Sequence, residues 1–473
     1  MRAGAATHCL SHPATILVLV LALGAGLLAV QGADQATPEP LLLTGIRILD
    51  TRAGRYVPAA AVLIAGDRIA GIFTQVPTDV PAGTRRMDLA GTTLVPGLGD
   101  MFATASPDGL ADADFYYAMA LAHGVTSYRV VGARLPWAAA QRERVRAGDM
   151  LAPRLSIGGP RLDQMGGLSM STQRVTDAPA ARREVAEQAS LGADWVSVSA
   201  TTTPDVYRAI VPAARARKMR VSGEPGTTTV SELIRLGVDA IDRLGFFSRS
   251  RDDYERELSA RADYPHDDRD AITDYFWLHA GPSDIKPAIP KTLRQRAVVI
   301  PMLASFNGVL AAEALNQDPA LQILPARWRE ALQGRAHPRA WPGAARAARA
   351  ADARGRLVRD FVTAGANIAT GVDVESTGYN IPGAGVHREL SLLVAAGLSA
   401  SDAIRAATIN CAELLGAAGS LGQIKVGFKA DLIAVEGDPL ARIEDLQRIK
   451  LVVRGGEALE RDQLLAQARR AAR

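Results

Sequence analysis

Eight short runs of β-branched or apolar residues, each followed by a helical stretch rich in Ala, Leu, Arg and Glu, constrain this chain most. Strands that alternate with helices form parallel sheets, because each helix carries the chain back to the start of the next strand. Eight such units over roughly 300 residues predict a parallel (β/α)8 barrel, whose active site lies at the carboxyl ends of the strands. An open, doubly wound sheet is the alternative. The runs are Thr93 to Val95, Ser127 to Val131, Arg154 to Ile157, Trp195 to Val198, Met219 to Ser222, Ala240 to Asp242, Val298 to Pro301 and Asn367 to Thr370.

Both flanks of this alternating region have strand character instead. Before it, short strands are joined by Gly66-Asp67, a dipeptide suited to a tight hairpin turn. After the helical stretch Ser401 to Leu415, strand patterns return at Ala430 to Val435 and at Lys450 to Val453. We therefore predict a barrel over residues 93–415, and one small composite β-sandwich domain formed by residues 41–92 and 416–462.

One long segment, about residues 246–293, interrupts the rhythm of strands and helices. It carries many charged and aromatic residues. Insertions of this length in compact domains are often lids over a site, and a peripheral decoration is the alternative.

The N-terminus resembles a secretory leader. Residues Ala14 to Val30 are almost wholly apolar, Arg2 precedes them, and the small residues Gly32 and Ala33 follow. We expect residues 1–33 to be a signal peptide and the mature chain to be exported, to the periplasm or outside the cell. An uncleaved N-terminal anchor is the alternative, because about 17 apolar residues approach the shortest helix that spans a bilayer. In that case the membrane is contacted through this segment.

Charge and composition exclude one class of partner and limit the chemistry. The chain has 54 basic and 50 acidic residues, so its net charge of +4 provides no concentrated positive field for nucleic acid. Only six of the basic residues are lysines, and His8 and His12 of the seven histidines lie in the leader. Cys9 also lies there, which leaves Cys411 and no intramolecular disulfide in the mature chain.

Ten short motifs follow one another along the chain: Gly91 to Met101, Gly124 to Arg129, Gly192 to Val196, Gly237 to Ile241, Gly371 to Asp373, Glu389 to Gly397, Ala406 to Thr408, Leu421 to Ile424, Gly427 to Leu432 and Gly437 to Pro439. In this order they resemble signatures of the amidohydrolase superfamily, in its imidazolonepropionase and prolidase-like branch. The resemblance covers about residues 41–456. It implies a barrel enzyme that hydrolyses amide, cyclic amide or ester bonds with one or two divalent metals, often zinc, which activate a water and polarise the scissile carbonyl.

The metal ligands that the resemblance implies are substituted in this chain. Relatives place His-x-His directly behind the pair that corresponds to Asp100-Met101, since residues two apart on a strand point the same way. Here Phe102 and Thr104 occupy the two histidine positions, and a phenyl ring has no lone pair to donate to a metal.

The remaining ligand positions have changed as well. Ser197 stands where relatives carry the bridging lysine, the fifth-strand histidine maps to Gly223 or, with a shift of one, to Glu224, and the sixth-strand histidine maps to Arg243. Asp373 on the eighth strand remains, at the position that in working relatives binds metal and shuttles the proton. We therefore expect no metal cofactor.

The five histidines outside the leader do not rebuild such a site. His123 precedes the second strand and is expected to be structural. His266, beside several aspartates, fits either a calcium site or a solvated charged run. His279 reaches the barrel mouth only as a lid residue, and His337 lies in an Arg-rich helical stretch. His387 follows the eighth strand, where relatives often carry a substrate-contacting histidine, with a structural role equally open.

Arg243 suggests what replaces the metal. If its side chain points into the barrel mouth, it pairs with Asp373 or Glu224 and fills the volume of the metal. Arg-carboxylate pairs are strong at such sites. This built-in cation keeps the acids ionised but does not lower the pKa of a water, as a metal does.

Three functions follow from this pattern. The first is a catalytically degenerate amidohydrolase that binds a small molecule or a partner, such as an active homologue or a second copy of itself. The second is a divergent hydrolase of carbon-nitrogen bonds, cyclic amide or dipeptide-like, with Asp373 as base and assistance from Glu224, Arg243, His387 or His279. The third is a structural or assembly role without a pocket.

Overall fold

A computed structural model describes residues 38–104, 112–165, 171–245, 250–261, 277, 297–306, 321, 323–326, 328–330, 344–374 and 380–472. The expected leader, most of the expected insertion, and His266, His279 and His337 lie outside the described residues. Within these ranges, no helix is long and apolar enough to cross a membrane.

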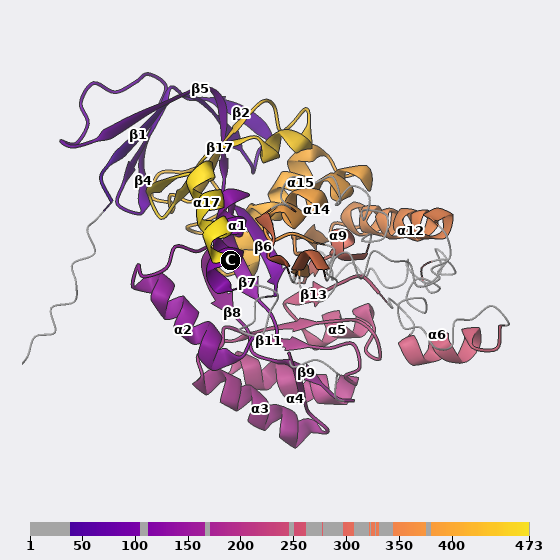
Figure 1. The fold of residues 1–473 in the computed structure, drawn as a ribbon. Helices are drawn as coiled ribbons and strands as arrows, with labels where there is room; N and C mark the ends of the chain where they lie inside the picture. The colour runs from indigo at the N-terminus through magenta and orange to yellow at the C-terminus, as the bar shows by residue number, and fades with distance from the viewer. Residues whose placement is uncertain are drawn as a thin grey trace, which may run out of the picture. The chain divides into compact units, whose positions relative to one another are not determined.

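Eight parallel strands form the predicted barrel (Figure 1). Hydrogen-bonded ladders join β6 to β8 and β11 to β15, and the bridge between Gly158 and Trp195 connects β8 to β11. The ring closes where the Met101 N–H donates to the Thr370 carbonyl at 2.8 Å. The barrel is confirmed, and the open sheet is excluded. The strands are β6 (Leu98–Ala103), β7 (Val125–Val130), β8 (Arg154–Ile157), β11 (Trp195–Val198), β12 (Arg220–Gly223), β13 (Ala240–Asp242), β14 (Val298–Ile300) and β15 (Asn367–Ile368).

The first predicted barrel strand was placed wrongly. Thr93 to Val95 lie in β5 (Arg85–Pro96), which pairs with strands of the other sheet, and the barrel begins at β6. The chain changes sheets at Gly97, where a Cβ would stand 2.1 Å from the Thr126 hydroxyl oxygen. Because the residues on both sides of Gly97 are apolar, the hydrophobic pattern conceals this break.

Both ends of the chain contribute to one eight-stranded sheet, with the order β18-β17-β16-β5-β1-β3-β4 and β2 paired with β1. Strand β5 is parallel to β1 and antiparallel to β16, so it joins the N-terminal and C-terminal parts. The predicted hairpin at Gly66-Asp67 is present, since Ala65 pairs with Arg68. The strands are β1 (Leu41–Asp50), β2 (Arg55–Pro58), β3 (Ala61–Ala65), β4 (Arg68–Phe73), β5, β16 (Leu432–Glu436), β17 (Ile449–Arg454) and β18 (Glu457–Glu460).

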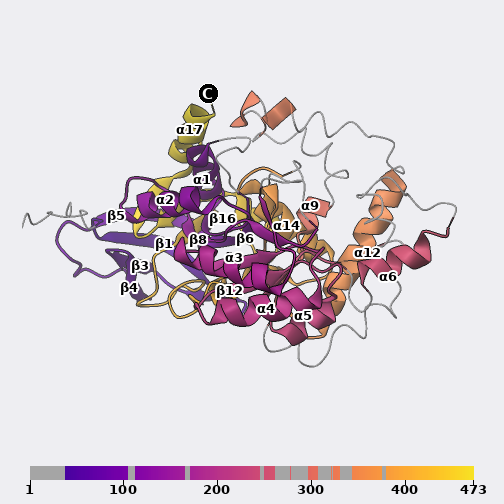
Figure 2. The ribbon, with the colours of Figure 1, turned by 90° about the horizontal axis from the view of Figure 1, so that it is seen from below.

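Helices cover the outside of the barrel, and α3, α4 and α5 lie side by side beyond β11 and β12 (Figure 2). Helix α5 shows how the sequence sets such a helix. Thr229 and Glu232 form a reciprocal capping box at its start, and Gly237, with a φ of 85°, ends it. The helices are α1 (Ala113–Ala122), α2 (Leu135–Arg146), α3 (Ala178–Ser190), α4 (Pro204–Arg215), α5 (Val230–Leu236), α6 (Arg251–Leu258), α9 (Leu303–Phe306), α12 (Ala344–Thr363), α14 (Ala384–Ala395), α15 (Ala400–Ala407), α16 (Ile409–Leu414), η4 (Ile443–Gln447) and α17 (Arg461–Ala471).

Strand residues alternate between the helix layer and the barrel interior. On β11, Val196 and Val198 pack in the large core shared with the helices, whereas Trp195 packs with interior residues of other strands. Two short strands, β9 (Arg161–Asp163) and β10 (Thr172–Arg174), extend the sheet beside the carboxyl end of β11. They place polar side chains at the barrel mouth.

A buried carboxylate ties the barrel to the composite sheet. Asp431 accepts two hydrogen bonds from Arg154 on β8, at 2.5 Å from Nε and 3.0 Å from Nη2, and one from the Gly455 N–H at 2.8 Å. Burial opposes the charge on Asp431, but the guanidiniums of Arg454 and Arg154 hold its pKa below the usual value. These contacts bridge a barrel strand and the C-terminal strands.

We expect Asp431→Asn to lower the free energy of unfolding by about 3 kcal/mol, because two largely buried guanidiniums would lose their carboxylate. Urea denaturation followed by circular dichroism measures this loss. The matched control is Asp205→Asn, which removes an exposed pair with Arg208 and should change the free energy by less than about 1 kcal/mol. Equal effects of the two substitutions would contradict the assignment.

Candidate ligand site at the barrel mouth

Four polar side chains meet at the carboxyl ends of the barrel strands. Thr104 follows β6, Glu224 follows β12, Arg243 follows β13 and Asp373 lies beyond β15. The structure therefore brings together four residues that the sequence singled out, Thr104, Glu224, Arg243 and Asp373. This end of a (β/α)8 barrel is where such folds build their sites.

The pair of Arg243 and Asp373 is the centre of this group. The Asp373 side chain is 1% exposed, and Arg243 donates from Nη2 to its Oδ2 atom. The Thr104 hydroxyl lies 3.4 Å from the other carboxylate oxygen of Asp373, and Arg243 Nε lies 3.4 Å from Glu224 Oε1. Burial opposes the charge on Arg243, but Glu224, Asp373 and Asp242 raise its pKa above the usual value. The guanidinium is therefore a permanent cation at the mouth.

Arg243 adopts a left-handed backbone conformation, with a φ of 69°. This conformation costs a non-glycine residue about 1–2 kcal/mol. Its N–H donates to the Ile300 carbonyl at 2.9 Å, which fixes the strained residue against β14. Neighbouring residues of a regular strand point to opposite faces, yet Asp242 and Arg243 both contact groups inside the barrel. The turn of the backbone at Arg243 accounts for this.

A second ion pair lies deeper in the barrel. Arg129 on β7 has a fully buried side chain and donates from Nη2 to Asp242. Its guanidinium carbon is 4.8 Å from the centre of the Trp195 ring and 5.8 Å from that of Phe102. The guanidinium carbon of Arg243 is 5.5 Å from the same Phe102 ring. Phe102 therefore lies within cation–π distance of both arginines.

Sequence analysis missed Arg129 and Asp242, although a signal was present. Both are charged residues within short runs that are otherwise apolar or small and were predicted to be barrel strands. A charged side chain in such a strand is rarely buried without a partner. Two opposite charges of this kind predict an interior pair.

Position 223 does not face the mouth, so the mapping of the fifth-strand histidine to Gly223 is wrong. A Cβ on Gly223 would lie 2.7 Å from the Tyr207 hydroxyl and 2.9 Å from Leu233, and these residues belong to α4 and α5. The next residue, Glu224, contacts Arg243. Of these two residues, Glu224 is therefore the one that lies at the mouth.

The residues at the mouth do not fit the divalent metal that the resemblance implies. Phe102 and Thr104 offer no imidazole, Ser197 accepts a hydrogen bond from Ser222 at 3.1 Å inside the barrel, and Arg243 is a cation. In the part of the chain that the structure describes, no three His, Cys, Asp or Glu side chains converge on one point. A guanidinium contacts the retained carboxylate directly.

His387 is not among the residues at the mouth, so of the two roles left open, substrate contact and structural packing, its contacts support the structural one. On α14, its Nε2 donates to the His123 carbonyl at 2.8 Å, and the two rings are 6.3 Å apart. His123, at the end of α1, donates from Nδ1 to the Met119 carbonyl at 2.8 Å. Burial lowers the pKa of His387 to about 3 and that of His123 to about 4. Both histidines are neutral parts of helix packing.

Short strand β9 adds residues that the sequence did not reveal. Nη1 of Arg161 lies 3.4 Å from Glu224 Oε2. Asp163 accepts hydrogen bonds from the hydroxyls of Ser199 at 2.7 Å and Thr201 at 2.9 Å. A three-residue strand is too short to show a periodic pattern in the sequence. The one available signal was that Arg161 and Asp163 follow closely after the predicted strand Arg154 to Ile157.

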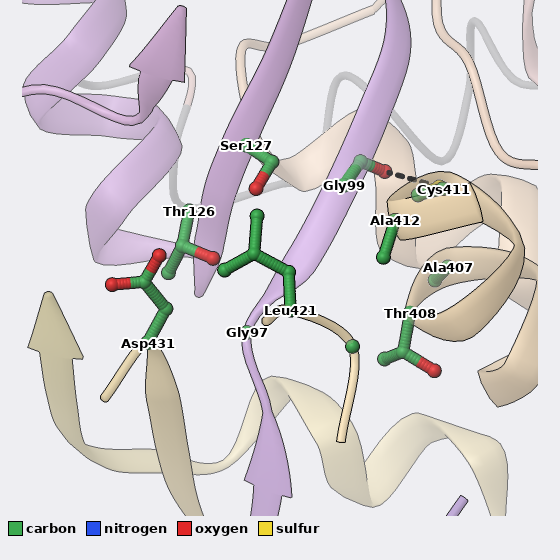
Figure 3. Close-up of a pocket in the computed structure, with 11 residues that line it drawn as sticks. Gly97, Gly99, Thr126, Ser127, Ala407, Thr408, Cys411, Ala412, Leu421 and Asp431 are labelled. Carbon is green, nitrogen blue, oxygen red and sulfur yellow. Dashed lines mark hydrogen bonds between the residues drawn. The ribbon is translucent and has the colours of Figure 1, made fainter. Parts of the chain in front are cut away.

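The amino ends of the strands hold a different hollow, shown in Figure 3. It is lined by Gly97, Thr126, Asp431, Cys411 and Leu421, among others, and has room for about one water, 10 Å³. Cys411 is a free, buried cysteine, and burial raises the pKa of its thiol to about 12. A space this small cannot hold an organic substrate.

Comparisons with known proteins agree with this architecture. Residues 346–459 match the Amidohydrolase family. Among curated proteins, none matches the sequence. The structure is similar to that of a putative prolidase from Bifidobacterium longum, with 23% sequence identity and a TM-score of 0.66 over 91% of this chain and 99% of that chain.

Two further solved structures are similar over most of their length. A bottromycin amidohydrolase has 20% identity and a TM-score of 0.67, over 93% of this chain and 92% of that one. A Xaa-Pro dipeptidase with bound methionine in its active site has 20% identity and a TM-score of 0.63, over 89% and 100%. These matches confirm the resemblance that the sequence motifs indicated. At such identities the structural likeness shows the fold.

We expect Arg243→Leu to lower the free energy of unfolding by about 3–5 kcal/mol, since Asp373 would remain buried without its cation. The double variant Arg243→Leu/Asp373→Asn removes both charges and should recover at least half of that loss. Urea denaturation of the two single variants and the double variant measures the coupling. Additive losses would show that the pair contributes no mutual stabilisation.

The buried histidines generate a pH-dependent prediction. Because their folded pKa values lie below the usual 6.5, protonation favours the unfolded chain, and each costs about 2 kcal/mol of stability between pH 7 and pH 5. Asp100 and Glu389, whose pKa values burial raises to about 7, act in the opposite direction over this range. The test must therefore compare the change in stability between pH 7 and pH 5 in a histidine variant with the same change in the unmodified protein.

His387→Gln keeps a side-chain N–H donor and removes the titrating ring. The loss of unfolding free energy from pH 7 to pH 5 should be about 2 kcal/mol smaller in this variant than in the unmodified protein. Urea denaturation at both pH values tests this. An unchanged loss would mean that His387 is already protonated, or solvated, in the folded protein.

Proposed function

We propose that this chain, which has the amidohydrolase fold, is an exported protein that has lost metal-dependent hydrolysis and binds a small ligand or a partner at its barrel mouth. One observation carries this proposal: the Arg243 guanidinium is in contact with the Asp373 carboxylate. Of the hydrolytic residues that the family resemblance implies, Asp373 is the one that this chain retains. Its carboxylate forms an ion pair with Arg243.

A divalent metal and the Arg243 guanidinium differ in the chemistry that they support, and this difference favours binding over hydrolysis. A divalent metal in this family supplies an activated water, by lowering its pKa to near neutrality, and polarises the scissile carbonyl. A guanidinium neutralises nearby acids but binds water through N–H donors, which do not make that water more acidic to the same extent. The Asp373 carboxylate accepts a hydrogen bond from Arg243, so one of its oxygens is already engaged with the guanidinium. We accordingly propose that no metal cofactor belongs to this site.

Export and partners belong to the same proposal. The leader-like residues 1–33 support secretion to the periplasm or beyond. N-terminal sequencing of protein from the periplasmic fraction tests this, with a start near Gly32 or Ala33 as the supporting result. An intact N-terminus in the membrane fraction would favour the anchor. The partner is proposed to be a small molecule, with an active homologue or a second copy of this chain as alternatives.

A second candidate function is a divergent hydrolase of cyclic amide or dipeptide-like bonds. It is favoured by the two carboxylates that remain at the mouth, Asp373 and Glu224, and by the Thr104 hydroxyl 3.4 Å from Asp373. Such a set can carry acid-base catalysis without a metal if the Arg243 contact opens when substrate binds. The two candidate functions differ in one measurable property: the divergent hydrolase turns over such substrates, and the binding protein does not.

We predict that protein purified without chelators contains far less than one equivalent of zinc, iron or manganese by mass spectrometry. Dipeptides, hydantoins, lactams and lactones should not be turned over, with or without added divalent metals. Tightly held stoichiometric metal would overturn the proposal. So would turnover that Asp373→Asn abolishes and that the exposed control, Asp205→Asn, leaves intact.

A further inference from the structure

Glu224 lies between two arginines that come from different strands. Its Oε2 is 3.4 Å from Arg161 Nη1, and its Oε1 is 3.4 Å from Arg243 Nε. Arg161 is on β9, Glu224 follows β12 and Arg243 follows β13. We call Arg161, Glu224 and Arg243 the arginine clamp.

Glu224 occupies this clamp loosely. Good N⁺–H···O⁻ bonds measure about 2.7–2.9 Å, and strong arginine–carboxylate pairs engage two guanidinium nitrogens side by side. The pair of Arg154 and Asp431 in this protein has that two-pronged form, at 2.5 and 3.0 Å. Each arginine of the clamp instead meets Glu224 through one nitrogen at 3.4 Å.

The Arg161 guanidinium uses few of its hydrogen-bond donors. A guanidinium carries five N–H groups. Across the described ranges, the contact with Glu224 is the one ion pair or hydrogen bond recorded for the Arg161 side chain. That side chain is 20% exposed, so part of it reaches the solvent.

We propose that the arginine clamp binds the carboxylate group of a small organic acid, and that Glu224 holds the place of this carboxylate when no ligand is present. The ligand carboxylate binds the Arg161 fork in two-pronged form and displaces Glu224, which stays with Arg243. The inference rests on the proposed binding function and names the ligand class for that site.

Charge balance selects a monoanion over a dianion. Arg243 pairs with Asp373 and would keep Glu224, so among the side chains that the structure describes in the clamp, the positive charge left for the ligand is that of Arg161. Asp163, on the same strand as Arg161, and the displaced Glu224 would repel a second negative charge. The planar Arg161 fork also matches a planar carboxylate.

The test uses N-acetylglycine as the probe and N-acetylglycinamide as its uncharged match, in titration calorimetry at low and at physiological salt. We expect the acid to bind at least about tenfold more tightly than the amide. Arg161→Gln should reduce the affinity for the acid to that for the amide. Glu224→Gln should raise the affinity for the acid about tenfold, because the competing carboxylate is removed.

Arg208→Gln is the matched control, since Arg208 pairs with Asp205 on the exposed side of α4 and should leave both affinities unchanged. Circular dichroism checks that each variant is folded. The gain expected of Glu224→Gln cannot arise from misfolding. The clamp is overturned if the acid and the amide bind equally, if the acid binds neither the unmodified protein nor Glu224→Gln, or if Glu224→Gln weakens binding.

These outcomes are distinct from failure of the proposed function. Equal binding of the acid and the amide would contradict the arginine clamp but would still agree with a binding function. Hydrolysis of N-acetylglycine that depends on Asp373 would contradict the proposed function. In that case the clamp stands or falls by whether Arg161→Gln raises KM with kcat unchanged, as expected for a residue that holds the carboxylate and does not act on the scissile bond.

Discussion

Charge inside a closed barrel must be matched by opposite charge, and this requirement organises the interior. A buried carboxylate without a cation is far more costly than a well-packed ion pair. Asp373, 1% exposed, obtains its cation from Arg243, and Asp242 obtains its cation from Arg129. Phe102 lies within 6 Å of both guanidinium carbons. The two pairs and this ring therefore form one charge-compensated cluster that extends from the mouth into the barrel interior.

The fold makes this compensation possible because parallel strands deliver their carboxyl ends to one rim. Arg161, Glu224, Arg243 and Asp373 are far apart in sequence but meet there. The left-handed residue at Arg243 adds what a regular strand cannot, since it turns two consecutive side chains toward the interior. The cost of this conformation is offset by the ion pair that it permits.

Much of this could be predicted from the sequence, and the limits have physical causes. Strand–helix alternation predicted the barrel, and the ordered motifs placed Arg243 near Asp373. The start of β6 was misplaced, because apolar residues continue through the sheet change at Gly97. The burial of His387 against α1 depends on how α14 is rotated, and the contact between Arg161 and Glu224 depends on a three-residue strand. Such long-range packing leaves no local pattern.

Phe102 and Arg243, which replace two metal ligands of the relatives, depend on each other through contact. A change of either one alone therefore affects the surroundings of the other. A histidine in place of Phe102 would bring an imidazole between two guanidiniums, where its protonated form is repelled and its ring offers a poorer cation–π face. Removing Arg243 alone would leave Asp373 uncompensated without creating new ligands. Neither single change leads back toward a metal site. The ion-paired arrangement is therefore a distinct, self-consistent state of the barrel mouth, in which Glu224 is held loosely by Arg161 and Arg243, at 3.4 Å from each.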